Sequence, residues 1–122
     1  MKTKEEINHM VKEMVMAICH GGFGGLQAML GAQPLTITEN SFQFSFKMFR
    51  KANIFKIELD EAQDLYNCYF IKQRKYTTKD FMNGLKISDK KFEPSIVKEI
   101  KGIFFDQVQE FFETTTGLRT CL

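Results

Sequence analysis

The chain has 122 residues, of which 43% are hydrophobic and 26% are charged. This length and composition are typical of one globular domain, 1–122, and exclude an intrinsically disordered chain. The formal net charge of +2 is too small to identify a nucleic-acid-binding protein by itself. Thirteen phenylalanines and no tryptophan indicate a core of aromatic rings that need no buried hydrogen-bond partner. No uncharged run is long enough to span a membrane, so we expect no membrane contact.

The N-terminal residues predict a helix with a break after it. Thr3 and Glu6 have the spacing of a capping box. Apolar residues then recur at steps of three or four, which predicts a helix from about Lys4 to Cys19. The glycines within 21–25 favour a break, because adjacent glycines lose much backbone entropy in a helix. Residues 26–30 then predict a further helical turn or two.

Four stretches of alternating apolar and polar residues follow, separated by short polar turns. They cover Leu35–Thr38, Ser41–Phe49, Ile54–Leu59 and Leu65–Gln73. Alternation places successive side chains on opposite faces of a strand, and short connections favour antiparallel neighbours. The sequence therefore predicts a four-stranded antiparallel meander. The apolar face of this sheet carries Phe42, Phe44, Phe46, Phe55, Ile57, Tyr66 and Phe70.

The C-terminal part permits two interpretations. Ser95–Ile100 could be a fifth strand, because Ile96 and Val97 are β-branched and Gly102 follows. Alternatively, helical spacing of apolar residues predicts one long amphipathic helix from Ser95 to about Thr115, and we prefer this interpretation. The fold class is then α+β, with the helix packed on the apolar face of the sheet. The helix residues expected to be buried there are Phe104, Phe105, Val108, Phe111 and Phe112.

Between the sheet and this helix lies a basic segment. Residues 71–101 contain nine basic and four acidic residues, a net charge of +5. Within it we expect a surface excursion over 76–94, pinned to the body by hydrophobic anchors such as Phe81, Met82 and Leu85. The single domain is thus divided into a helical segment 1–31, a sheet 35–75, the basic excursion 76–94 and a C-terminal helix 95–118.

The three cysteines, Cys19, Cys68 and Cys121, cannot all pair within one chain, and each has apolar neighbours. Free cysteines in such surroundings behave as small hydrophobic residues. We therefore expect no disulfide framework and a location in the reducing cytoplasm.

No motif in the chain indicates catalysis. The two histidines, His9 and His20, lie in the first helical segment, with no metal-ligand spacing around them. The glycine-rich stretch follows a predicted helix and lacks the Gly-Lys-Ser/Thr ending of a phosphate loop. Carboxylates between Glu58 and Asp64 match no calcium loop and are expected to form a hydrated turn. We expect no enzyme, no cofactor and no metal.

The residues that could bind a partner are one phenylalanine and a set of basic and aromatic residues. Phe23, at the centre of the glycine-rich stretch, could be an anchor for another protein. The other candidates surround one hairpin and begin the basic segment, and they are Arg50, Lys51, Lys72, Arg74, Lys75, Tyr76 and Lys79. Aromatic and basic residues together also permit the binding of unpaired nucleic acid, which is the alternative function.

Several segments taken in order resemble a group of small uncharacterised proteins encoded by bacteriophages and mobile elements. The similarity covers most of 26–122, and this chain departs from the pattern by the inserted Tyr76–Phe92. The resemblance implies a phage accessory protein that binds and modulates or inhibits a host protein in the host cytoplasm, with anti-defence activity such as anti-CRISPR as one form. The segments that carry it are Phe42–Lys47, Arg50–Asn53, Lys56–Leu59, Asp64–Phe70, Val97–Phe104, Asp106–Gln107, Phe112–Glu113 and Thr116–Leu118.

The oligomeric state is predicted to be a monomer or a homodimer. The first helix has more apolar surface than one packing face needs, with Met10, Met14, Val15 and Met16 close together. Methionine-rich surfaces adapt to varied partners, although core filling is their commoner use.

Overall fold

A computed structural model describes residues 3–47, 49–74, 77–86, 93–118 and 120 of the chain. Helix α1 covers Lys4–Ile18 and begins at the predicted cap, where the backbone N–H of Glu6 donates to Thr3 Oγ1 (3.2 Å). Helix α2 covers Phe23–Leu30. The glycine break between them is present, because Gly22 precedes α2 with a φ of 78°, which is unfavourable for residues with a side chain.

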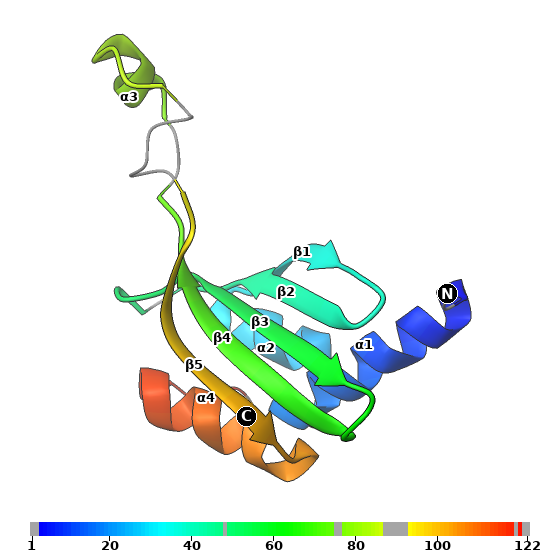
Figure 1. The fold of residues 1–122 in the computed structure, drawn as a ribbon. Helices are drawn as coiled ribbons and strands as arrows, with labels where there is room; N and C mark the ends of the chain where they lie inside the picture. Colours follow the sequence, from blue (N-terminus) through cyan, green and yellow to red (C-terminus); the bar gives the residue numbers. More distant parts are fainter. Residues whose placement is uncertain (1–2, 48, 75–76, 87–92, 119, 121–122) are drawn as a thin grey trace.

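The sheet is an antiparallel meander of five strands, and each strand pairs with its neighbours in the sequence (Figure 1). The four predicted strands are present, and a fifth strand extends the sheet beyond β4. The strands are β1 (Gln33–Ile37), β2 (Ser41–Ser45), β3 (Ile54–Asp60), β4 (Leu65–Lys72) and β5 (Ser95–Ile103).

The prediction of one long C-terminal helix is wrong for its first half, which forms the strand β5. Gly102 has a φ of 70°, which is incompatible with a helix interior, and its N–H donates to Asn67 Oδ1 of β4 (3.0 Å). Two irregularities in the β4–β5 register let β5 pair with β4 despite the helix-like spacing of its apolar residues. The helix proper begins later, after the short 3₁₀ turn η2 (Phe105–Gln107), as α4 (Val108–Thr116).

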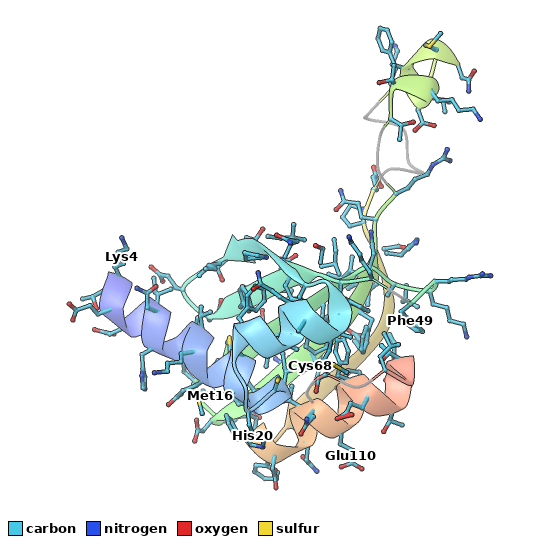
Figure 2. All side chains as sticks on the ribbon, turned by 180° about the vertical axis from the view of Figure 1, so that it is seen from behind. Lys4, Met16, His20, Phe49, Cys68 and Glu110 are labelled. Carbon is cyan, nitrogen blue, oxygen red and sulfur yellow. The ribbon has the colours of Figure 1, made fainter. Side chains whose placement is uncertain are left out.

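Helices α1, α2 and α4 lie on the same face of the sheet (Figure 1, and from behind in Figure 2). Phe112 of α4 is fully buried there, and the seven residues predicted to form the apolar face are all buried. Four phenylalanines of the sheet layer surround the Phe112 ring at centroid distances of 5.0–6.4 Å, and they are Phe44, Phe46, Phe55 and Phe70.

The other predicted helix-face residues are buried to different extents. Val108 is fully buried, and Phe111 is half-buried against Phe70, with 5.4 Å between ring centroids. Phe104 and Phe105 are 62% and 43% exposed, so the prediction that they are buried is wrong. The reason is local: β5 ends at Ile103, and the N–H of Phe104 donates to Gln107 Oε1 (2.9 Å) at the turn into η2.

The prediction of free cysteines holds for Cys68 and is wrong for Cys19. Cys68 of β4 is free and fully buried under the helices, and burial raises the pKa of its thiol to about 12. Cys19, directly after α1, is disulfide-bonded. The end of the chain is held at the same place, because the buried Thr120 hydroxyl donates to the carbonyl of Ile18 (2.7 Å). In the part of the chain that the structure describes, no helix is long and apolar enough to cross a bilayer.

Replacing Phe112 with alanine should lower the free energy of unfolding by about 3–5 kcal/mol, because it empties the centre of the aromatic cluster. The matched control is Phe104→Ala, which deletes the same ring from an exposed position and should change stability by no more than about 0.5 kcal/mol. Urea unfolding of both variants measures this difference. Equal losses from the two changes would contradict the packing described above.

Candidate functional site

The segment between β4 and β5 projects from the body of the protein (Figure 1). We call this segment, 73–94, the arm. Its described residues are 73–74, 77–86 and 93–94, and they include the short helix α3 (Thr78–Met82). In Figures 1 and 2 α3 lies well away from the other helices, so local contacts must hold it in shape.

The carboxylate of Asp80 supplies those local contacts. One of its oxygens accepts hydrogen bonds from the N–H and the hydroxyl of Thr77 (2.9 and 2.8 Å), and the Thr77 hydroxyl in turn accepts from the N–H of Asp80. Its other oxygen accepts a hydrogen bond from Arg74 Nη2 (2.9 Å). Asp80 is only 5% exposed, so this carboxylate is the centre of the α3 structure. The sequence contains the signal for the start of this helix, since Thr77-x-x-Asp80 has capping-box spacing.

Phe81 and Met82 of α3 are 70% and 79% exposed. The expectation that they pin the segment to the body is therefore wrong, and they instead form an apolar surface at the end of the arm. The hydrogen bonds of Asp80 and Thr77 orient α3. They do not involve the side chains of Phe81 and Met82, which are therefore available for contact with a partner. Lys79, a predicted site residue, is exposed on the same helix.

The other predicted basic residues gather where the arm leaves the sheet. Arg50 and Lys51 lie in the corner between β2 and β3, and Lys72 ends β4. Asn53 ties this corner to the arm: its Nδ2 donates to the carbonyl of Gln73 (2.8 Å), and its Oδ1 accepts from the N–H of Gln73 (2.9 Å).

Two of the remaining predicted residues, Lys75 and Tyr76, lie outside the described residues. Phe23 is described, and it does not join the arm. It is the first residue of α2, and its ring packs edge-on against Phe42 and Phe44 at 5.9 and 6.2 Å. Phe23 therefore packs against the core on the helix-covered face of the sheet.

A hollow of about 880 Å³ lies between α1, the β3–β4 turn and η2, and we call it the groove. Four of its lining residues are apolar or aromatic, and they are Met16, Tyr66, Phe104 and Phe105. The lining also has three carboxylates and two basic side chains, which we call the rim, and they are Glu13, Asp64, Asp106, His9 and Lys12.

Carboxylates outnumber basic side chains at the rim of the groove, so its charge is negative. Burial raises the pKa of Tyr66, and the nearby charges of Glu13 and Asp64 raise it further. His9 Nε2 lies 3.0 Å from Glu13 Oε1. Within the described residues, no group of three His, Cys, Asp or Glu side chains could hold a metal ion. The apolar and acidic side chains of the groove suit the binding of an apolar and basic group.

The face of the sheet opposite the helices carries Tyr69, an aromatic residue of β4. Lys56 Nζ lies 5.5 Å from the centre of the Tyr69 ring and 4.0 Å from Glu58 Oε2. Burial raises the pKa of Tyr69, and the nearby charges of Glu58 and Glu99 raise it further. Because carboxylates surround Tyr69, this face is a poor surface for a phosphate backbone.

Comparison of the chain with models of protein families, with curated proteins and with solved structures finds no match. The resemblance to phage and mobile-element proteins therefore stays a prediction.

Asp80→Asn should loosen the arm without loosening the body. The amide keeps the size of the side chain but loses the charge that holds Thr77 and Arg74. Loss of a helix cap costs about 0.5–2 kcal/mol, so chymotrypsin should cut after Phe81 several-fold faster, while the thermal unfolding midpoint stays unchanged. Lys79→Gln, an exposed change on the same helix, is the control. An unchanged cleavage rate in Asp80→Asn would show that α3 is held by something else.

Proposed function

We propose that this protein is a non-enzymatic interaction module that binds another protein through the exposed end of its arm. One observation carries the proposal: Phe81 and Met82 lie on a helix that is capped and oriented by Asp80, yet both side chains are largely exposed. Large apolar side chains held in water at the end of a projection are typical of interaction sites.

The gain available from burying these two side chains is considerable. Complete burial of a Phe or Met side chain contributes about 1.5–3 kcal/mol, so the pair could supply about 3–6 kcal/mol before the cost of association. Lys79, which is exposed on α3, adds positive charge beside this apolar surface. The partner surface that fits is an apolar pocket with acidic residues at its rim.

The resemblance to phage and mobile-element proteins supports a more specific form of the proposal. In that form the chain is a phage accessory protein that modulates or inhibits a host protein in the host cytoplasm, with anti-defence activity, including anti-CRISPR, as one example. The disulfide at Cys19 bears on this location, because the cytoplasm keeps most cysteines reduced. Cytoplasmic activity would require the fold to persist with Cys19 reduced.

The test compares three forms of the protein as bait in a bacterial host lysate. The arm variant carries Phe81→Ser and Met82→Ser. The matched control carries Leu35→Ser and Ile37→Ser, because these side chains on the edge strand β1 are also about half exposed, at 51% and 50%.

The proposal predicts a protein that the wild type and the β1 variant retain equally and that the arm variant retains at least tenfold less. A tenfold loss corresponds to about 1.4 kcal/mol, which is modest for the loss of two anchor residues. Equal retention by all three baits would contradict the proposal.

Nucleic-acid binding is the second candidate, favoured by the gathering of Arg50, Lys51, Lys72 and Arg74 at one end of the sheet. It predicts that fluorescence anisotropy of a labelled single strand will show binding that weakens steeply between about 50 and 200 mM salt. Arg50→Glu with Lys72→Glu should abolish that binding. These reversals should leave partner capture by Phe81 and Met82 intact if the leading proposal is correct.

A further inference from the structure

The groove and the end of the arm have matching chemistry. Phe104 and Phe105 lie at the groove as partly exposed apolar side chains, and Met16 beside them is 39% exposed. Phe81 and Met82 form the apolar end of the arm. Each surface would lose unfavourable contact with water if the other covered it.

Charge favours the same pairing. The rim of the groove has three carboxylates against one lysine and one histidine, whereas the arm, 73–94, has six basic and three acidic residues. A volume of about 880 Å³ falls within the range of pockets that enclose a drug-sized ligand. Two side chains of the arm are smaller than such a ligand.

The two surfaces lie at opposite ends of the same strand. Tyr66, near the start of β4, lines the groove, and Lys72 at the end of β4 leads into the arm. The eight residues of β4 span about 26 Å at the rise of an extended strand, and the arm points away from the β3–β4 turn that borders the groove (Figure 1). An arm therefore cannot fill the groove of its own molecule.

We propose that the arm of one molecule docks into the groove of a second copy of this chain. Phe81 and Met82 cover Phe104 and its neighbours, and the basic arm meets the acidic rim. The contact joins two different surfaces, so it generates head-to-tail chains or closed rings, of which the smallest is a dimer with two reciprocal arm-to-groove contacts. It uses the arm of the proposed function, and a partner protein would compete with it for Phe81 and Met82.

The test is sedimentation velocity of the full chain over a range of concentrations. The average mass of the wild type should rise with concentration. Two variants should each remain monomeric at concentrations at least tenfold higher: the arm variant, Phe81→Ser with Met82→Ser, and a groove variant, Phe104→Ser. The β1 variant, Leu35→Ser with Ile37→Ser, is the control and should associate like the wild type. All of these changes fall on exposed side chains, so unfolding midpoints should match the wild type.

Mixing the arm variant with the groove variant gives the most specific result. The arm variant keeps an intact groove and the groove variant keeps an intact arm, so an equimolar mixture should form a 1:1 pair and no larger species. A wild type that stays monomeric, a mixture that stays monomeric, or loss of association in the β1 variant would each overturn the inference.

These outcomes are independent of the proposed function. The groove variant has an intact arm, so it should still capture a partner protein from lysate while failing to associate with itself. Capture without self-association in the wild type would reject only the further inference. Self-association without capture by the arm would reject only the proposed function.

Discussion

Ring packing of Phe112 against the phenylalanines of the sheet is the interaction that joins the two layers of this protein. Phe44 and Phe55 are cross-strand partners, and Phe55 is in turn opposite Phe70, so the three rings form a row across β2, β3 and β4. Phe112 lies on this row from α4. A slip of one residue in any of these strands would turn its rings to the opposite face, so the same contacts that stabilise the fold also fix its register.

The strands of this row could be predicted from the sequence because alternation is the strongest signal that a half-buried strand carries. The C-terminal region is harder to predict, because β5 pairs irregularly with β4. Its apolar residues therefore do not alternate, and their spacing is the same as in an amphipathic helix. The pairing of β5 with β4 decides between the two structures, and the positive φ of Gly102 and its bond to Asn67 agree with it. No local pattern reveals the disulfide of Cys19, or the hydrogen bond that joins Thr120 to Ile18 across 102 positions of the sequence.

The candidate site was predicted in part. Basic residues of the β2–β3 corner and of β4 were recognised, and the strand order explains why they meet at one end of the sheet. The arm helix was missed although its capping box is present in the sequence, because its five residues are too few to show helical periodicity. The groove could not be foreseen, because it depends on Phe104 being exposed at the turn between β5 and η2. Both surfaces lie outside the aromatic row, where the fold leaves apolar side chains uncovered.

The aromatic row holds the body of the protein together, whereas hydrogen bonds of Asp80 to Thr77 and Arg74 hold the helix of the arm. Native-state hydrogen exchange tests this division most directly, because it reports the free energy of opening at each amide. Amides of Phe55 and Ile57 in β3 should exchange only through global unfolding, while those of Phe81 and Asn83 in the arm should exchange through local opening at least about 100-fold faster. Arm amides that are as well protected as those of β3, or β3 amides that exchange through local opening, would contradict this division.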